Sequence, residues 1–524
     1  MQLERKEIGI ENIFFAAISG LLLTGAFPRL GMHWLAWFAL VPLLFSIINL
    51  SPRNSFLVGF FAGFVHNMTL LYWLSYTMNT YGHLPWPLCI AILVLFCAYL
   101  SSYLGVFSVV VTRLCAKPSV CFLTVPFLWV ALEYVRSFLF SGFPWELIGY
   151  SQFENLRLIQ ISEIFGVYGV SFLIVLVNGS ILLIILYIKG LYWQGARIPK
   201  YLAFGSILTS AVLLCLTWIT GGLSLKSTDE LMRNSLSVPV TVVQGNIEQS
   251  EKWDPAFQLD TIQKYLHLSL LAKPDKSSLM VWPETAMPFY LLFNIELTEM
   301  VKEGIRATGT DFLIGSPSYK RKGKELEYYN SAYLFSPKGR IYGKYDKVHL
   351  VPFGEYVPFK KWFPFFGKMV AQVGDFVSGR KGNTIPWKPS NLGVQICYEI
   401  IFPDLSREMV KNGAGLLVNI TNDAWYGRSS APYQHFSMAV FRAIENRRSL
   451  IRSANTGISG FVDPAGRIIG STPLFQEAVL TQRVPVFQKT TFYTRFGDVF
   501  ALICLVVTIL VAIRQAVKEF KETH

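Results

Sequence analysis

The sequence predicts a polytopic α-helical membrane domain of about eight spans that carries an inserted α/β sandwich domain. Two observations lead to this fold class. The 524 residues are 52% hydrophobic and only 15% charged. In a soluble protein, about a quarter of the residues are charged. The shortage of charge is also uneven, because residues 8–221 and 498–513 are mostly apolar while residues 222–497 have an ordinary globular composition.

The apolar stretches are long enough, or nearly long enough, to cross a bilayer, which takes about 20 apolar residues. They lie near residues 8–27, 33–50, 56–76, 88–112, 119–138, 162–188, 201–221 and 498–513. The first stretch also resembles a signal peptide, because Arg5 and Lys6 precede it, but Thr24-Gly-Ala-Phe-Pro is only a fair cleavage site and more spans follow directly. We therefore expect a retained helix.

Basic residues beside these stretches predict the orientation of the chain. If both termini face the cytoplasm, the inside segments carry Arg5, Lys6, Arg53, Arg113, Lys117, Lys189, Arg197, Lys200, Arg514, Lys518 and Lys521. The short outside loops then carry only Arg29, Arg136 and Arg157. This distribution satisfies the positive-inside bias. We therefore expect a transmembrane domain over 1–221, an extracytoplasmic catalytic domain over 222–497, and an eighth span with a cytoplasmic tail over 498–524.

The net charge of +13 fits the lysines and arginines that flank membrane spans. Nucleic acid is not an expected partner, because no long basic cluster or nucleic-acid motif is present. A transporter is disfavoured as well, since the spans show no repeat and no charged relay. Glu133, near the end of a span, is the one candidate for such a relay and fits a loop anchor better.

Strand-like runs alternate with helical patterns in residues 222–497. The prediction comprises a strand and loop over 238–247, strands near 278–282, 311–316, 328–336, 339–345, 392–397, 414–420 and 450–453, a hairpin across 462–467, and helices near 256–272, 295–308, 402–412 and 434–448. Strands outnumber helices, and no Gly-rich dinucleotide or Walker motif is present. This pattern favours an α/β sandwich with helices outside a mixed sheet.

Cys397 is the only cysteine in the long polar stretch between Cys215 and Cys504. A domain outside the cytoplasm usually faces an oxidising compartment, and one cysteine cannot form an internal disulfide. A free reactive thiol is one interpretation. A buried structural cysteine is the other, and on the cysteine alone the two carry equal weight.

Two further residues stand at the ends of strand-like segments. Glu284 ends Leu279-Met-Val-Trp-Pro-Glu, and Lys347 follows the tyrosine-rich segment 340–346. A Glu, a Lys and a Cys can supply a base, a cation and a nucleophile for acyl transfer through a thioester. The thiol needs activation, either by Glu284 or by the N-terminal dipole of the helix predicted over 402–412. Taken singly, Glu284 fits a helix cap and Lys347 a surface lysine, so the hypothesis rests on the set.

Several motifs carry a resemblance to a known family. They are Val242-Val-Gln-Gly-Asn-Ile, Trp282-Pro-Glu-Thr, Tyr329-Asn-Ser-Ala, Lys347-Val-His-Leu-Val-Pro-Phe-Gly-Glu-Tyr-Val-Pro, Ile396-Cys-Tyr-Glu, Thr421-Asn-Asp-Ala-Trp-Tyr-Gly and, in the apolar region, Gly142-Phe-Pro-Trp-Glu-Leu-Ile-Gly-Tyr-Ser-Gln. Through them the chain resembles the nitrilase superfamily and, over nearly its full length, the membrane-embedded branch of apolipoprotein N-acyltransferases.

The resemblance implies a nitrilase-like α-β-β-α sandwich for the inserted domain. It implies that Cys397 is the nucleophile, Glu284 the general base and Lys347 the oxyanion stabiliser. Glu355 and Glu399 match the supporting carboxylates of the family. They would hold the lysine charged and raise the pKa of one carboxylate, or serve only as structural hydrogen-bond acceptors, and both roles remain open.

Four further residues match positions that line or support the pocket of the family, namely Asn330, Tyr398, Trp253 and Trp425. For the aromatic residues, plain core packing is a strong alternative. The resemblance also implies the partners, which are a phospholipid acyl donor, a diacylated apolipoprotein acceptor and the lipid bilayer. It implies a bacterial inner-membrane protein with its catalytic domain on the periplasmic side. We expect a monomer that uses no cofactor and no metal.

An aromatic segment follows Lys347. It is interrupted by prolines, mixed with lysines, and contains Phe353, Tyr356, Phe359 and Trp362. Such a mixture suits a bilayer interface, so we expect a lid that dips into the outer leaflet and admits lipid. Packing of the same side chains under the domain, against the spans, is a serious alternative that can coexist with a lid.

Two other functions remain open on the sequence. One is a membrane-anchored nitrilase-type amidase that acts on small amides, against which the aromatic segment argues. The other is a lipid-binding or scaffold protein with a decayed site, against which the intact Glu284, Lys347 and Cys397 argue.

Overall fold

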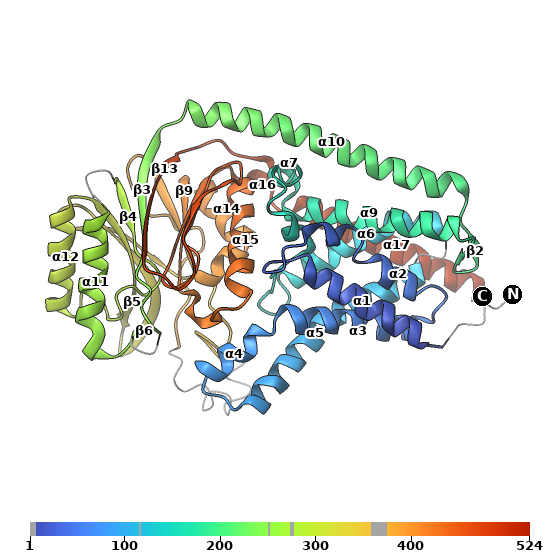
Figure 1. Cartoon of the computed structure of the whole chain (residues 1–524), viewed down its shortest axis with the longest axis horizontal. Helices are drawn as coiled ribbons and strands as arrows, with labels where there is room; N and C mark the ends of the chain where they lie inside the picture. Colours follow the sequence, from blue (N-terminus) through green and yellow to red (C-terminus); the bar gives the residue numbers. More distant parts are fainter. Residues whose placement is uncertain (1–6, 115–116, 250–251, 273–276, 358–374, 524) are drawn as a thin grey trace. The chain divides into compact units, whose positions relative to one another are not determined.

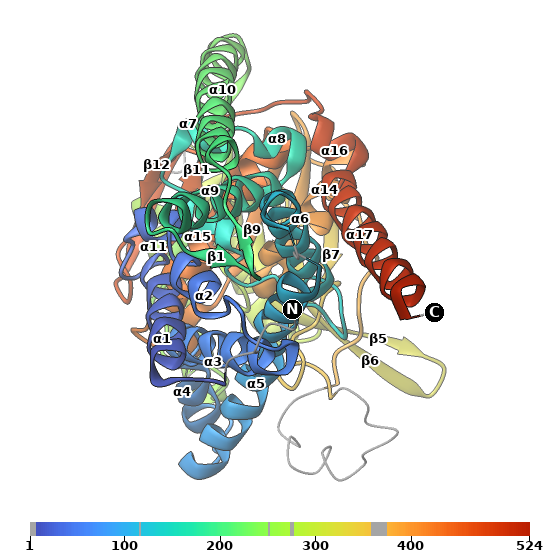
Figure 2. The same cartoon turned by 90° about the vertical axis from the view of Figure 1, so that its right-hand side faces the viewer.

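The computed structural model describes residues 7–114, 117–249, 252–272, 277–357 and 375–523. The chain divides into two compact units (Figures 1 and 2). A helical unit comprises residues up to Ser224, the short segment Ser429–Ser437 and the residues from Phe496 onward. An α/β unit comprises Leu225–Arg428 and Met438–Arg495.

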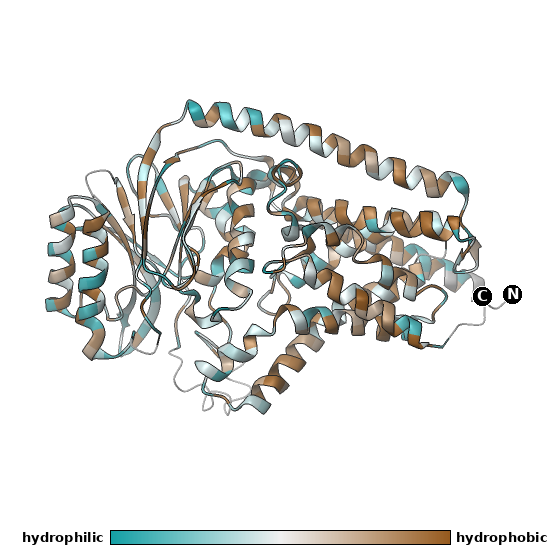
Figure 3. Ribbon diagram, viewed as in Figure 1, coloured by the Kyte–Doolittle hydropathy of each residue, from teal (hydrophilic) through white to brown (hydrophobic). Residues whose placement is uncertain are grey.

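Apolar helices of different lengths build the helical unit, as the hydrophobic colouring of Figure 3 shows. They are α1 (Ile10–Gly25), α2 (Val41–Ser46), α3 (Pro52–Leu70), α4 (Trp73–Thr80), α5 (Trp86–Leu114), α6 (Pro118–Arg136), α9 (Val167–Ile188), α10 (Lys200–Arg233) and α17 (Val499–Thr523). Short elements join them: η1 (His33–Trp37), η2 (Ile148–Gln152), α7 (Leu156–Ile159), α8 (Ser162–Phe165), and the antiparallel pair β1 (Tyr192–Trp193) and β2 (Ala196–Arg197).

Among the described residues, five helices are long and apolar enough to cross a membrane, namely α5, α6, α9, α10 and α17. The pair α3–α4, bent by 52°, makes a sixth candidate if it is one span, and α1 and the η1–α2 segment are shorter apolar helices. Every predicted apolar stretch therefore coincides with a helix or a helix pair. The count of eight spans stays a prediction, because two of those stretches fall short of a full span by length.

Residues of the 142–152 motif hold the segment Ser429–Ser437 inside the helical unit. The indole Nε1 of Trp145 donates to Oε1 of Gln434 at 2.9 Å, and the Oγ of Ser437 donates to Oε1 of Glu146 at 3.2 Å. The backbone N of Ile148 in turn donates to Oε1 of Glu133 at 2.8 Å. Glu133 is thus a loop anchor, as expected.

Two mixed sheets form the centre of the α/β unit. The six-stranded sheet has the order β13-β3-β4-β5-β6-β7, and the five-stranded sheet has the order β12-β11-β10-β9-β8. The strands are β3 (Ser237–Gln244), β4 (Leu279–Val281), β5 (Asp311–Lys322), β6 (Glu325–Phe335), β7 (Ile341–Asp346), β8 (Asn391–Ile396), β9 (Ala414–Thr421), β10 (Ser449–Ala454), β11 (Gly460–Val462), β12 (Ile468–Ser471) and β13 (Ala478–Pro485). Strands β3, β4 and β5 are parallel to one another, as are β8, β9 and β10. Strand β13 was not among the predicted elements.

Helices cover the outer faces of both sheets, which gives the predicted four-layer α-β-β-α sandwich (Figure 1). Helices α11 (Gln258–Leu271) and α12 (Ile295–Thr308) lie on the six-stranded sheet, and α14 (Pro403–Lys411) contacts β8 and β9 of the other. Helix α15 (Ala431–Asn446) lies on the same side as α14. The remaining short helices are η3 (Pro255–Phe257), η5 (Cys397–Ile401), η6 (Asp423–Tyr426) and α16 (Phe492–Phe496).

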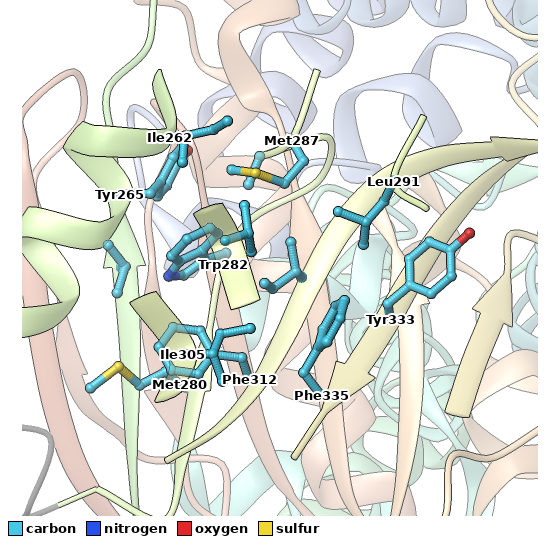
Figure 4. Close-up of a cluster of buried hydrophobic side chains, with 14 of the residues drawn as sticks. Ile262, Tyr265, Met280, Trp282, Met287, Leu291, Ile305, Phe312, Tyr333 and Phe335 are labelled. Atoms are coloured by element: carbon cyan, nitrogen blue, oxygen red, sulfur yellow. The ribbon is translucent and has the colours of Figure 1, made fainter. Parts of the chain in front are cut away.

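The core beneath α11 and α12 fixes the first layer on its sheet (Figure 4). Trp282 is fully buried there, and its ring lies 5.1 Å from that of Tyr265 and 5.5 Å from that of Phe312. The indole Nε1 of Trp282 donates to Oγ of Ser269 at 2.9 Å. The N–H group of this large buried side chain thereby has the hydrogen-bond partner that burial requires. The position of Trp282 is fixed, and this constrains the chain that follows it.

Gly315 of β5 lets the chain pass close by at Pro283–Thr285. A Cβ added at Gly315 would lie 2.4 Å from the carbonyl oxygen of Pro283 and 2.8 Å from the Cα of Glu284. Backbone atoms cannot yield as a flexible side chain can. The absence of a side chain at Gly315 therefore determines where Glu284 lies.

We predict that Gly315→Ala lowers the free energy of unfolding by about 1–3 kcal/mol, the usual cost of inserting a methyl group into packed structure. Urea denaturation of the detergent-solubilised protein, followed by tryptophan fluorescence, measures this. Gly470→Ala in β12 is the matched control, because the three atoms nearest to its added Cβ belong to the side chains of Gln482 and Leu480 and lie at 3.1 Å or beyond. Equal stability of the two variants would contradict the packing argument.

Candidate active site

Glu284 follows β4 and presents a fully engaged carboxylate. Its Oε1 accepts a hydrogen bond from Nδ2 of Asn330 at 2.8 Å, and its Oε2 accepts one from the backbone N of Asn422 at 3.0 Å. Thr285, the next residue, has a left-handed φ of 50°, which bends the chain away immediately after the glutamate. The carboxylate is therefore held in one orientation from two different sheets.

Lys347 follows β7 and is 1% exposed. Its Nζ lies 2.9 Å from Oε2 of Glu355 and 3.9 Å from Oε1 of Glu284. Burial opposes protonation of this amine, but the charges of Glu355 and Glu284 outweigh burial, so the pKa of Lys347 lies above its ordinary value. Asn330 binds both carboxylates, since its Nδ2 also donates to Oε1 of Glu355 at 2.9 Å. Lys347 is therefore a fixed cation at neutral pH.

Cys397 follows β8 and is the first residue of η5. It is 6% exposed and has a left-handed φ of 53°, which costs about 1–3 kcal/mol for a residue with a side chain. Burial and the nearby charge of Glu284 raise the pKa of the thiol, and Lys347 opposes them in part. The thiol is therefore neutral at rest, and a nucleophilic role would require a base to remove its proton.

One of the two expected activators of the thiol is not in place. Helix α14 begins at Pro403, after the turn η5 and Phe402. A helix dipole acts only within about the first turn of its own helix. The expectation that this dipole favours a thiolate at Cys397 is therefore wrong, and Glu284 remains as the candidate base.

Glu399 is fully buried and ties the segment of Lys347 to the turn of Cys397. Its carboxylate accepts hydrogen bonds from the backbone N of Val348 at 2.6 Å, of His349 at 3.0 Å and of Ile396 at 2.7 Å. The hydroxyl of Tyr345 donates to the same carboxylate at 3.0 Å. Burial raises the pKa of Glu399 to about 7, although the backbone donors lower it in part. The two supporting carboxylates thus differ, because Glu355 pairs with the lysine while Glu399 binds mainly backbone groups.

The expected pocket residues separate into buried and exposed groups. Tyr398 is 8% exposed, and its ring lies 5.2 Å from that of Phe402. By contrast, Trp253 is 50% exposed and Trp425 is 37% exposed, so core packing does not account for them.

Within the expected lid, Phe353 is 54% exposed. The backbone N of Phe353 donates to the carbonyl oxygen of Tyr356 at 2.8 Å, which closes a tight turn. Phe359 and Trp362 lie outside the described residues. The lid therefore stays a prediction that begins at this turn.

A chain of buried polar side chains that leads to the backbone of Cys397 was not predicted from the sequence. Arg452 of β10 is fully buried and pairs with Asp423, with Nη2 2.8 Å from Oδ2. Arg452 also donates to the side chain of Asn419, whose Nδ2 donates to the carbonyl oxygen of Cys397 at 3.3 Å. An arginine inside the apolar run of residues 449–454 was the available signal, because a buried charge needs partners. The backbone donor of Asn422 left no signal in the sequence.

In the part of the chain that the structure describes, no group of three or more His, Cys, Asp or Glu residues could hold a metal ion. The chemistry that these residues can perform is nucleophilic catalysis by a thiol beside a carboxylate base and a fixed cation.

An α-β-β-α sandwich that brings a Glu, a Lys and a Cys together defines the carbon–nitrogen hydrolase class. Residues 239–488 match the family model described as carbon-nitrogen hydrolase. Residues 19–180 match the model described as the apolipoprotein N-acyltransferase N-terminal domain. The α/β unit and the helical region thus each match a family model.

The full chain also has curated relatives. It is 44% identical over 502 residues to an apolipoprotein N-acyltransferase of Geobacter metallireducens, with 96% of this chain and 94% of that protein covered. It is 32% identical to one of Methylococcus capsulatus, with 93% of each chain covered. Among solved structures, an amidase from Nesterenkonia sp. AN1 is 18% identical with a TM-score of 0.38, covering 50% of this chain and 95% of that one. The chain belongs to the apolipoprotein N-acyltransferase family.

We predict that Glu399→Gln lowers the free energy of unfolding by about 1–3 kcal/mol, because the amide group turns a donor toward backbone N–H groups that need an acceptor. Thermal and urea denaturation measure this loss. The control is Glu325→Gln, whose side chain is exposed. If Glu399→Gln were as stable as wild type, the carboxylate would not be the anchor that its hydrogen bonds indicate.

Proposed function

We propose that this protein transfers an acyl chain from a phospholipid, through a thioester on Cys397, to the α-amine of the N-terminal diacylglyceryl-cysteine of apolipoproteins. The transfer completes the maturation of a lipoprotein. Relatives named apolipoprotein N-acyltransferase from several bacteria support this function over hydrolysis of small amides.

The observation that carries the proposal is the arrangement of Glu284 and Lys347 around Cys397 in a chain that matches this family along its length. Both charges act on the pKa of the thiol, and the carboxylate and the ammonium lie 3.9 Å apart. These observations support a base role for Glu284 and a cation role for Lys347 beside a neutral nucleophile, the combination that acylation of a thiol requires.

In the first half-reaction, Glu284 takes the proton of Cys397 as the sulfur attacks the ester carbonyl of the phospholipid. The ammonium of Lys347 stabilises the oxyanion that forms. When the tetrahedral intermediate collapses, the C–O ester bond breaks and Glu284 returns its proton to the leaving oxygen. Lysophospholipid departs, and the acyl chain remains on Cys397 as a thioester.

In the second half-reaction, the neutral α-amine of the acceptor attacks the thioester carbonyl. Glu284 takes a proton from this nitrogen and passes it to the sulfur as the C–S bond breaks. The products are an amide and the free thiol. Because an amide is more stable than a thioester, the exchange runs downhill. Water competes with the amine, so an apolar surrounding such as the aromatic segment would have to exclude it.

The proposed function also implies how the chain is arranged in the membrane. The helices that are long and apolar enough to cross a membrane suit a donor that lies in the bilayer. We propose a transmembrane domain over 1–221, a catalytic domain over 222–497 on the periplasmic side of the inner membrane, and an eighth span with a cytoplasmic tail over 498–524. The bias of flanking lysines and arginines supports this orientation. We further propose that the protein acts as a monomer.

We predict that the wild-type protein gains the mass of one acyl chain when it is incubated with a defined phospholipid, and that Cys397→Ala gains none, because the alanine has no nucleophile. Cys397→Ser tests whether an oxygen can replace the sulfur. Intact mass measurement after separation from lipid reads the result.

Cys215→Ala serves as the control, since Cys215 is an exposed thiol that could be acylated without catalysis. It should gain the same mass as wild type. The thioester proposal is wrong if wild type never gains the acyl mass, or if Cys397→Ala gains it equally.

A further inference from the structure

Lys252 is a second buried lysine in this site, and no step described so far uses it. It lies in the turn that follows β3 and is 3% exposed. Its Nζ donates to the backbone carbonyl oxygen of Glu284 at 3.0 Å. Its backbone N donates to the carbonyl oxygen of Glu248 at 3.1 Å.

The surroundings of Lys252 differ from those of Lys347. No carboxylate oxygen of a described residue lies within ion-pair distance of the Nζ of Lys252, whereas Lys347 has Glu355 at 2.9 Å. The titratable groups that act on Lys252 are Glu284, from the segment after β4, and Cys397, from η5. Glu248, at the start of its own turn, is exposed. Among the described residues, Lys252 is therefore a buried cation without an ion-pair partner, and burial of such a charge is costly.

We propose that Lys252 is a positioning residue, whose ammonium holds the main chain of Glu284 and stabilises the negative charge that develops on the sulfur of Cys397. The inference rests on the proposed function, in which Glu284 removes the proton of that thiol. Its physical basis is Coulomb attraction in a site from which water is largely excluded, where a cation favours the ionised form of a nearby acid.

The charge of Lys252 can change in the working pH range, and that of Lys347 cannot. Burial lowers the pKa of Lys252 to about 8, against the opposing effect of Glu284 and Cys397. The pKa of Lys347 lies above its ordinary value. Above pH 8 the next proton is therefore lost from Lys252 rather than from the thiol, and the two groups titrate as a coupled pair.

Alkylation of Cys397 by iodoacetamide tests this coupling in the full-length protein, because the reaction reports the thiolate and needs no acyl transfer. The rate is measured between pH 6 and 10 by mass analysis of the peptide that contains Cys397. For wild type, we expect the rate to rise about tenfold for each pH unit below pH 8 and more slowly above it.

Substitutions at Lys252 separate charge from packing. In Lys252→Arg the charge does not titrate, so the steep rise should continue above pH 8. In Lys252→Met we expect alkylation at pH 7 to be slower than in wild type by about tenfold, the effect of a thiol pKa raised by about one unit. The control is Lys264→Met in α11, which removes a partly exposed partner of Glu477 and should leave the profile within about twofold of wild type.

Acylation by phospholipid at pH 7, followed by intact mass, is the second measurement on the same variants. Acyl-enzyme formation should be slowed by about tenfold in Lys252→Met and restored to within about threefold in Lys252→Arg. If Lys252→Met does not fold, as judged by its thermal transition, the profile of Lys252→Arg alone decides the question.

The proposal is overturned if alkylation of Lys252→Met and Lys252→Arg follows the wild-type profile, or if both variants lose alkylation equally, as a purely structural role would give. If the alkylation profiles change as expected but no variant, wild type included, forms an acyl-enzyme, the role of Lys252 stands and the proposed function fails.

Discussion

The buried carboxylate of Glu399 is the interaction on which the site depends most. It accepts hydrogen bonds from backbone N–H groups of two segments that come from different sheets. The donors are Val348 and His349 after β7, and Ile396 before Cys397. Lys347 follows β7 of the six-stranded sheet, and Cys397 follows β8 of the five-stranded sheet. A single fully engaged acceptor joins the two segments. Loss of either set of donors would leave buried polar groups without partners, at a cost of about 1–3 kcal/mol, so the interaction favours both turns forming together.

The remaining charged groups of the site have different roles. Glu355 keeps Lys347 protonated. The side-chain amide nitrogen of Asn330 donates a hydrogen bond to Glu284 and another to Glu355. The thiol itself is kept neutral by burial. A neutral thiol is a stable resting state, since a permanent thiolate oxidises readily. In the proposed mechanism, the thiol is activated when a carbonyl group arrives and the proton moves to Glu284.

Much of the arrangement could be predicted from the sequence, because local patterns carry it. Helix α12 has the predicted bounds 295–308, and the ends of β4, β7 and β8 carry Glu284, Lys347 and Cys397 as expected. Other features depend on partners distant in the sequence. Strand β13 pairs with β3, although more than half of the residues of the α/β unit lie between them in the sequence. The alternation of its own side chains did not mark it as a strand. The backbone N–H of Asn422 and the buried pair of Arg452 and Asp423 became visible only after the two sheets were brought together.

The central claim is that Cys397 carries the acyl chain between two lipid substrates. A single-turnover chase tests it most directly. The acyl-enzyme is formed with an isotopically labelled phospholipid, freed of lipid, and mixed with a peptide that begins with diacylglyceryl-cysteine. We expect the protein to lose the labelled acyl mass and the peptide to gain it as a hydroxylamine-resistant amide, at a rate no slower than steady-state turnover. If the acyl-enzyme persists, or releases only free fatty acid, while the same peptide is acylated under turnover conditions, the thioester is not the intermediate and the account is contradicted.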